Sequence, residues 1–346
     1  MSLVADNLSA ATKTRRNLRA EFDALASNCA VYPLASRAKI SLGGGDRTRW
    51  LNGMITNNIR DLSQGRGVYA FLLNPQGHIL GDLYAYNRGE DILLDIDQFQ
   101  LPKILSTFDH YIIMDDVEVV DVSGKLAAIG IAGPQSRKTL QSAGFDVSAL
   151  EPLQFVAVNW RNSPSTLVRS DSPAVESYEL WLDPAQSAEA QKSLVAAGAQ
   201  PVGAEAQELL RIASGIPRYG QDIRERDLPQ ETSQQRALHF SKGCYIGQEI
   251  VERIRSRGAV HRVFTGFLAH GDLPVPGPAI QIDGKDVGEI TSSAVIPIGT
   301  QDVSVALGYL RREAALPGKT LLAAGAKLTI APLPFAPVFP RSATEE

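Results

Sequence analysis

Three short apolar runs separated by two tight turns, between Arg66 and Asp97, constrain the fold more than any other part of the chain. The runs VYAFLL, ILGDLYAY and DILLDI have the length and the aliphatic and aromatic content of strands, and the turns between them contain NPQG and NRG. Turn residues placed in this way between apolar runs are typical of a β-meander. Helices are expected after Asp46, a suitable N-cap, and over QFQLPKILSTF, with a further strand at VEVVDV. The sequence therefore predicts strands with helices packed on one face.

The same order of elements returns further along the chain. LAAIGIAG predicts a strand, Pro134 begins a helix that ends near Gly144, and three strands follow at FVAVNW, STLVRS and SYELWL. Asp183 caps the next helix, which stops at Gly198. Beyond Arg262 short strands separated by Gly and Pro predict a small β-barrel. We therefore expect an α+β protein of three domains, which span 30–125, 126–260 and, for the barrel, 261–340.

Composition narrows the class of protein. With 34 Lys and Arg against 38 Asp and Glu the net charge is -4, so general binding to nucleic-acid backbones is not expected. Two cysteines are too few for a disulfide-rich secreted scaffold, and the five histidines show no H-E-x-x-H spacing, so no metal site is expected. Neither a signal-peptide core nor an apolar stretch of membrane-spanning length is present. We expect a soluble, cytoplasmic protein that does not bind membranes.

The segment FSKGCYIGQEIVERIRSRG, residues 240–258, contains the most unusual chemistry. Helical spacing of its apolar residues, with Gly247 at the start and Gly258 at the end, places Cys244 just before a helix N-terminus. From Arg236 to Arg262 there are six Lys and Arg, including Lys242, against two acidic residues, a local charge of +4. A positive helix end and a nearby ammonium favour a reactive thiolate. The alternative is a small buried cysteine in a tight turn beside a solvated helix face.

Two predicted strands each place a carboxylate beside an aromatic ring. Strand periodicity puts Asp82 and Tyr84 on one face of ILGDLYAY, and it puts Glu179 and Trp181 together in YELWL. A flat heterocycle with an amidine-like edge, such as a pterin, needs this pairing, because a carboxylate accepts two parallel N–H bonds while rings stack on the face. The alternative is a half-exposed strand with its polar residues outward.

Five segments resemble one known family. KGCYIGQE is similar to the K-G-C-Y-x-G-Q-E signature of the YgfZ family, folate-binding relatives of the glycine-cleavage T-protein, and RIASGIPRYGQDIRERDLPQE, from Arg211, resembles the segment that precedes it. WLNGMITNNI and NPQGHILGDLYAY resemble first-domain motifs, and GEITSSAVIP resembles a segment of the C-terminal barrel. The resemblance extends from Trp50 to Pro297 and therefore covers most of the chain.

The resemblance implies a three-domain cloverleaf of two ferredoxin-like domains and a β-barrel around a central folate site. The implied ligand is tetrahydrofolate or a polyglutamylated or one-carbon derivative, and the implied partners are iron-sulfur client or assembly proteins. T-proteins carry adjacent aspartates where this chain has Gly81-Asp82, and an acidic residue where it has Cys244, so these departures favour the YgfZ branch. The candidate catalytic residues are Cys244, Lys242 and Asp82, and the candidate cofactor-binding residues are Glu179, Asp82, Tyr84, Trp181, Arg211 and Tyr245.

Three functions fit these observations. The leading hypothesis is a tetrahydrofolate-binding protein, rather than a conventional enzyme, that supports assembly or repair of iron-sulfur clusters. The alternative is a folate-dependent aminomethyltransferase or other one-carbon transferase, in which Asp82 transfers a proton. A third hypothesis is an RNA-associated role for the arginines near Arg253.

Overall fold

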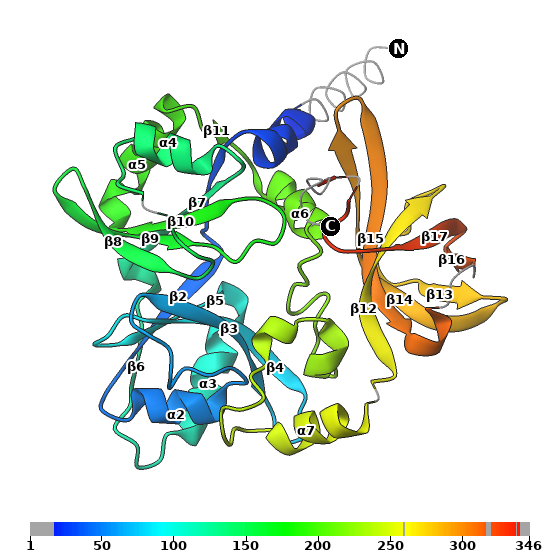
Figure 1. Ribbon diagram of the computed structural model, residues 1–346, viewed down its shortest axis with the longest axis horizontal. Helices are drawn as coiled ribbons and strands as arrows, with labels where there is room; N and C mark the ends of the chain where they lie inside the picture. Colours follow the sequence, from blue (N-terminus) through cyan, green and yellow to red (C-terminus); the bar gives the residue numbers. More distant parts are fainter. Residues whose placement is uncertain (1–16, 148, 259, 316–319, 337, 340–346) are drawn as a thin grey trace.

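The structure is a computed structural model that describes residues 17–147, 149–258, 260–315, 320–336 and 338–339. Two sheets and a barrel surround a common centre, with helices on the outer faces of the sheets (Figure 1). The predicted α+β class with a C-terminal β-barrel is confirmed. Residues 1–16, which bear on the signal-peptide expectation, lie outside the described residues. In the described ranges no helix is both long and apolar enough to cross a membrane.

The predicted meander forms one half of a five-stranded antiparallel sheet. Its strand order is β3-β4-β5-β2-β6, and the bounds are β2 Arg37–Gly43, β3 Arg66–Leu73, β4 Ile79–Asn87, β5 Ile92–Asp97 and β6 Glu118–Asp121. Helices α2 (Arg47–Met54) and α3 (Leu101–Tyr111) cover one face with an apolar core, and the short helix η1 (Gln98–Gln100) precedes α3. The opposite face, which presents Tyr69, Asp82 and Tyr84, is turned towards the centre of the molecule.

A six-stranded sheet is built from the next segments and from one earlier strand. Its order is β11-β1-β7-β10-β9-β8, with bounds β1 Ala30–Pro33, β7 Ala127–Ala132, β8 Phe155–Trp160, β9 Ser163–Arg169, β10 Ser177–Leu182 and β11 Gln200–Pro201. Helices α4 (Ser136–Ser142) and α5 (Pro184–Ala196) pack on it, and Asp183 caps α5 by accepting the Ala185 N–H at 2.8 Å. The predicted division places β1 in the first domain, whereas β1 pairs with β7 and β11 of this second sheet.

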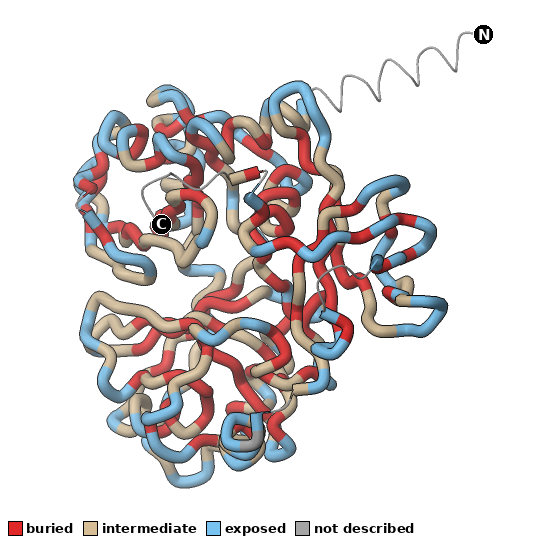
Figure 2. The backbone as a smooth tube through the Cα atoms, turned by 45° about the vertical axis from the view of Figure 1, so that its right-hand side comes forward, coloured by how far each residue is buried: buried red, intermediate tan, exposed pale blue. Residues whose placement is uncertain are grey.

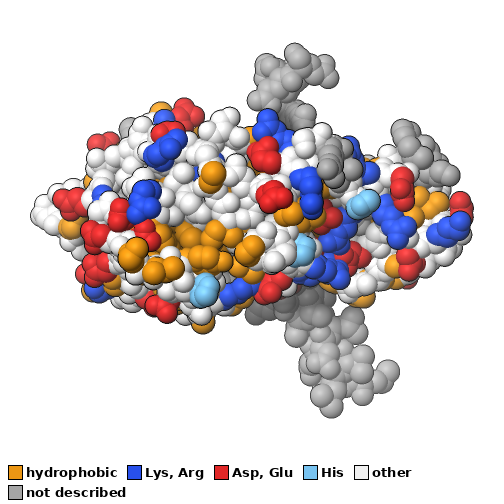
Figure 3. Space-filling view, turned by 90° about the horizontal axis from the view of Figure 1, so that it is seen from below, with side chains coloured by type: hydrophobic (Ala, Val, Ile, Leu, Met, Phe, Trp, Pro, Cys, Tyr) orange, Lys and Arg blue, Asp and Glu red, His pale blue; other side chains and the backbone are white. Residues whose placement is uncertain are grey.

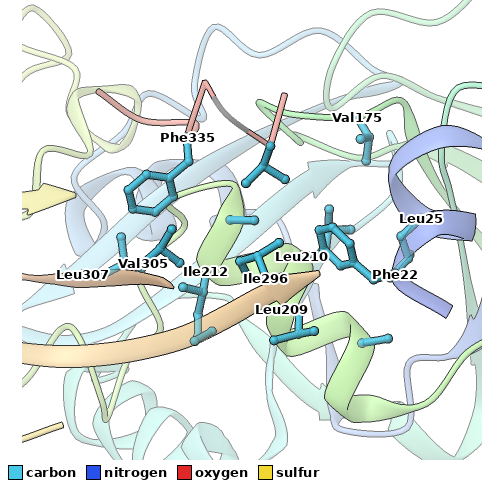
Figure 4. Packing of buried hydrophobic residues seen from close by; sticks show 14 of the residues in the cluster. Phe22, Leu25, Val175, Leu209, Leu210, Ile212, Ile296, Val305, Leu307 and Phe335 are labelled. Atoms are coloured by element: carbon cyan, nitrogen blue, oxygen red, sulfur yellow. The ribbon is translucent and has the colours of Figure 1, made fainter. Parts of the chain in front are cut away.

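The C-terminal strands close into a six-stranded barrel. Its bounds are β12 Arg262–His270, β13 Ala279–Ile282, β14 Lys285–Ile298, β15 Gln301–Arg311, β16 Leu321–Ala323 and β17 Ala326–Ala331. Helix α6 (Ala204–Ala213) lies between the barrel and the helical residues 17–27, and the three are joined by one apolar cluster. Figure 4 shows this cluster, to which Phe22, Leu25, Leu209, Leu210, Ile212, Ile296, Val305 and Leu307 contribute.

The two sheets meet through a small cluster of large side chains. Tyr86 and Leu93 of the five-stranded sheet pack against Val168 and Trp181 of the six-stranded sheet, and the Tyr86 and Trp181 rings meet edge to face at 5.0 Å. Buried backbone follows the strands, while exposed backbone lies mostly in the connections (Figure 2). This contact holds the inner faces of both sheets beside one another, which is what places strand residues from both around a shared cavity.

Candidate functional site

A central cavity of about 290 Å³ lies between the inner faces of the two sheets and the segment that follows α6. Four of the predicted site residues line it: Asp82, Tyr84, Glu179 and Arg211. The other four, Trp181, Lys242, Cys244 and Tyr245, are not among its described lining residues. The two carboxylates that strand periodicity predicted to face a ligand therefore line one cavity. The segment with the thiol is not part of its described lining.

Glu179 projects from β10 into this cavity. Its Oε2 accepts a hydrogen bond from the Trp181 indole N–H at 2.9 Å, and the Lys39 ammonium lies 3.8 Å away. Among the described residues no group donates to Oε1, so this oxygen is available to a ligand. Burial, with added repulsion from Asp95, raises the pKa of the Glu179 carboxyl. Trp181 is itself fully buried, so its contribution is to orient Glu179.

A buried ion cluster stands directly behind Glu179. Lys39 on β2 places its ammonium 2.8 Å from Asp95 on β5 and 4.5 Å from the centre of the Trp181 ring, and Arg37 donates to the same Asp95 oxygen at 3.0 Å. Burial opposes ionisation of Asp95, but the two cations outweigh it and lower the pKa of this carboxyl. Asp95 thus stays charged while Glu179 is pushed towards its neutral form.

Asp82 faces the cavity from β4, on the wall opposite Glu179. Its carboxylate accepts one hydrogen bond from the Tyr69 hydroxyl at 2.7 Å and another from the Gln100 side-chain amide at 2.8 Å. Burial raises the pKa of Asp82 despite these two donors, which lower it. Sequence reasoning missed both partners. The alternation of VYAFLL could have found Tyr69, whereas no local pattern marks Gln100.

Tyrosine rings line the wall beside Asp82. The Tyr69 and Tyr84 rings lie 5.0 Å apart, Tyr84 and Tyr86 stack at 6.5 Å, and the Arg236 guanidinium covers Tyr69 at 4.6 Å. Arg236 also forms an ion pair with Asp171. This pair lines both the central cavity and a larger neighbouring cavity of about 550 Å³ that continues towards the barrel.

Arg211 is engaged entirely by the protein. A guanidinium has five N–H donors, and all five are used in hydrogen bonds: two to Glu208, and one each to Asp222, Ser292 and the Ile216 carbonyl. These bonds tie α6 to the barrel strand β14 and to the segment after α6. Arg211 therefore shapes the cavity wall and has no donor left for a ligand.

The segment with Cys244 has the predicted local structure. Helix α7 (Gln248–Arg257) starts after Gly247 and ends at Gly258, and both glycines adopt positive φ. Cys244 is an exposed free thiol, so the alternative of a buried cysteine is wrong, while Cys29 is buried as expected. Lys242 is fully buried and donates to the main-chain carbonyls of Asn52 and Ile55.

Two further properties of this segment bear on its chemistry. Burial lowers the pKa of the Lys242 ammonium to about 7, with a contribution from Arg60. Tyr245 is buried, and its ring faces the Lys242 ammonium at 4.8 Å. The side chains on either side of Cys244 therefore anchor the loop to α2 and leave the thiol directed to solvent.

Four of the six cations counted in this part of the sequence are paired with acidic residues or buried in the structure. Arg236 pairs with Asp171, Lys242 is buried, and Arg262 pairs with three acidic residues: Asp227, Glu231 and Glu289. On α7, Arg255 pairs with Glu252. The face seen from below has Lys and Arg interspersed with Asp and Glu around an apolar patch (Figure 3). In the described ranges no group of three or more His, Cys, Asp or Glu could hold a metal ion.

The fold and the site together define an α+β protein whose two sheets each bring a carboxylate to a shared, tyrosine-walled cavity beside a β-barrel. The GCVT N-terminal domain family matches residues 6–242, more than half of the chain, and the chain belongs to this family.

Relatives and solved structures agree with this assignment. The chain is 27% identical over 300 residues to an aminomethyltransferase of Rubrobacter xylanophilus, with 86% of this chain and 80% of that protein covered. It is 26% identical over 334 residues to an aminomethyltransferase of Geobacillus kaustophilus, with 92% and 90% covered. The crystal structure of glycine cleavage system aminomethyltransferase T from Bartonella henselae matches with a TM-score of 0.82 at 19% identity, over 92% of this chain and 89% of that one, and shares the fold.

Proposed function

We propose that the central cavity binds a reduced folate and that the protein is a folate-dependent one-carbon transferase of the aminomethyltransferase type. One observation carries the proposal: the Glu179 carboxylate faces the cavity with Oε1 unoccupied and with a lone pair of Oε2 still available. The amidine-like edge of a pterin offers two parallel N–H donors to such a carboxylate. The Tyr84 ring, with the tilted Tyr69 ring beside it, supplies an aromatic surface for the heterocycle.

Asp82 supplies the acid–base group of the proposed reaction. It lies on the wall opposite Glu179, and its raised pKa brings the carboxyl closer to the range in which a proton can be both accepted and returned near neutral pH. The two named relatives, whose names describe aminomethyl transfer, support this reaction class. The transferred group would reach a folate held between the two carboxylates.

Binding is tested by calorimetric titration of tetrahydrofolate into the parent protein and Glu179→Gln. Loss of a hydrogen-bonded charge costs about 1.5–3 kcal/mol, so the variant should bind about ten- to hundredfold more weakly. Glu189→Gln is the matched control, because Glu189 lies on α5 of the same sheet layer, pairs with Arg161 and is not among the described residues that line the cavity. Equal affinity of the parent and Glu179→Gln would remove Glu179 from the pterin site.

Transfer is tested with a methylamine-loaded lipoyl carrier and tetrahydrofolate as substrates. Methylenetetrahydrofolate should form, and Asp82→Asn should lower the rate by about 100-fold or more while folate binding is retained. Asp97→Asn is the control, because Asp97 also lines the cavity but pairs with Arg37. Absence of product with the parent protein, or equal rates for the parent and Asp82→Asn, would contradict the proposed transfer.

A second candidate function rests on Cys244. An exposed free thiol at the start of a helix, in the KGCYIGQE segment, favours a folate-binding protein that supports iron-sulfur cluster assembly or repair. Cells that lack the protein can be supplied with Cys244→Ser, and with Ser241→Ala as a control in the same exposed loop. Loss of iron-sulfur enzyme activity with the cysteine variant alone would support this candidate, and full rescue by it would exclude Cys244 from the function.

A further inference from the structure

Among the residues that the structure describes, no strand pairs with one edge of the part of β4 that contains Asp82. Strand β5 pairs with β4 only from Tyr84 to Asn87, and a bulge at Leu80 interrupts the pairing with β3 on the other edge. Unpaired main-chain groups inside a protein need other partners. Two side chains supply them: the Tyr219 hydroxyl donates to the Leu80 carbonyl at 2.5 Å, and the Gln100 side-chain oxygen accepts the Asp82 N–H at 3.1 Å.

Gln100 holds Asp82 at two points. Its Oε1 accepts the main-chain N–H of Asp82, and its Nε2 donates to the Asp82 carboxylate at 2.8 Å. The orientation of the amide follows from chemistry, because a main-chain N–H can only donate and must therefore face the oxygen. The amide N–H is then the group that meets the carboxylate. Gln100 is nearly completely buried, so water does not compete for these bonds.

Gly81 leaves the space that this amide occupies. A Cβ at position 81 would lie 2.8 Å from Gln100 Oε1 and 3.5 Å from Ile104. The first distance is too short for a stable contact, so any side chain at position 81 would displace the Gln100 amide. Since Gly81 is not among the residues with positive φ, the requirement for glycine here is steric.

We propose that Gln100 is a positioning residue that directs the Asp82 carboxylate into the central cavity, and that this arrangement requires glycine at position 81. The inference rests on the proposed function in one respect only, the role of the Asp82 carboxylate in proton transfer. Tyr69 bonds the second carboxylate oxygen, so Asp82 is fixed from both sides. The other charged or titratable groups near Asp82 are Arg37 from β2, Asp97 at the end of β5, Tyr84 from β4, Tyr219 and Arg236.

The direct test is the titration of Asp82 in the protein without folate. Aspartate labelled with ¹³C at the carboxyl gives a signal for each residue, and the spectrum of Asp82→Asn assigns that of Asp82. In Gln100→Met the carboxylate loses a donor, so its pKa should shift upward. In Gln100→Glu an oxygen remains for the main-chain N–H, but two carboxyls then share one proton, so Asp82 should again titrate at higher pH.

Gly81→Ala separates positioning from the loss of polar groups. It leaves every hydrogen-bonding group in place and moves only the amide, so it should also shift the Asp82 titration upward. Gly124→Ala is the control, because a Cβ there meets nothing within 4 Å. An unchanged Asp82 titration in Gln100→Met, Gln100→Glu and Gly81→Ala would overturn the proposal and leave Gln100 with a structural role alone.

The transfer assay adds a second readout. The acid limb of the kcat profile should move to higher pH in these variants. Turnover should fall by about tenfold for each unit of that movement at pH values on the acid limb, with KM for folate changed less than about twofold. Equal loss at every pH would contradict the positioning role. If the parent protein transfers no one-carbon group, the proposed function fails, but the carboxyl titration still decides whether Gln100 controls Asp82.

Discussion

Replacement of Lys39 by methionine should measure how much one buried cation contributes to the stability of the contact between the two sheets. The Lys39 side chain is 2% exposed, and its ammonium lies between Asp95, at 2.8 Å, and Glu179, at 3.8 Å. Asp95 belongs to the five-stranded sheet and Glu179 to the six-stranded sheet, so Lys39 separates two negative charges across the contact between the sheets. Methionine fills similar space with no charge.

The size of the effect follows from which charges remain. Removal of one partner from a buried ion pair costs about 3–5 kcal/mol, because the other charge is left unpaired. Arg37 still bonds Asp95 at 3.0 Å in the variant, so the lower end of this range applies. We therefore expect Lys39→Met to lower the free energy of unfolding by about 3 kcal/mol near pH 8.

The loss of stability in Lys39→Met should depend on pH, because it depends on the charge of Glu179. Burial and Asp95 raise the pKa of Glu179 in the folded protein, so its contribution to stability is complete below the unfolded pKa and is lost as pH rises through the folded pKa. Without the Lys39 ammonium the pKa of Glu179 in the folded protein rises further, so more of the free energy of unfolding is lost as pH rises. Asp95, whose folded pKa is lowered, contributes in the opposite sense, and that contribution disappears at low pH. Lys39→Met should therefore be less harmful at pH 5 than at pH 8.

Urea unfolding followed by tryptophan fluorescence measures the free energy of unfolding of Lys39→Met at each pH. With a slope of about 3 kcal/mol/M, the midpoint should fall by about 1 M at pH 8. Lys39→Met/Glu179→Gln should recover most of the loss, whereas Lys192→Met on the exposed side of α5 should change stability by less than about 0.5 kcal/mol. A loss below about 1 kcal/mol at pH 8, or a double variant no more stable than the single one, would refute the electrostatic argument.

Two further substitutions test neighbouring parts of the site. Gly247→Ala should lower the free energy of unfolding in urea by about 2–4 kcal/mol, because φ is +80° and the new Cβ would lie 2.6 Å from the Asn74 carbonyl. The control Gly243→Ala, with φ of +94° and open space around the new Cβ, should lower it by only about 1–2 kcal/mol. Equal losses for the two variants would show that the contact with Asn74 is irrelevant. Trp181→Phe should lower the free energy of unfolding by about 2–3 kcal/mol. It should also weaken folate binding, because Glu179 loses the indole N–H that donates to it at 2.9 Å. Unchanged folate affinity in calorimetry would show that this hydrogen bond plays no part in ligand recognition.

Local patterns in the sequence predicted the strands of the meander, helix α7 and the faces of Asp82 and Glu179, because each depends on spacing within a few residues. Partners that come from distant segments could not be predicted in this way. Gln100 reaches Asp82 from η1, just before α3, and Lys39 reaches Glu179 from another sheet. The placement of β1 beside β7 and β11 likewise depends on sheet order, which no local pattern specifies.

A charge count along the sequence does not show where side chains point. Of the six Lys and Arg between Arg236 and Arg262, four are paired with acidic residues or buried. Arg236 and Arg262 turn inward to acidic partners from distant segments, and Lys242 is buried against main-chain carbonyls. The candidate site also grouped Cys244 with Asp82 and Glu179, but the thiol is not among the described residues that line the cavity.

The thiol loop and the cavity are nevertheless parts of one packed unit. Tyr69, which donates to Asp82, shares an apolar cluster with Tyr245, the residue after Cys244. Asn57 reinforces the link, because its side-chain amide donates to the carbonyls of both Tyr69 and Arg236. A partner that moved the loop would therefore act on Tyr69 and, through its hydroxyl, on the carboxylate in the cavity. The proposed folate chemistry at Asp82 and the proposed contact at Cys244 would therefore be linked through one cluster, although Cys244 is not among the described residues that line the cavity.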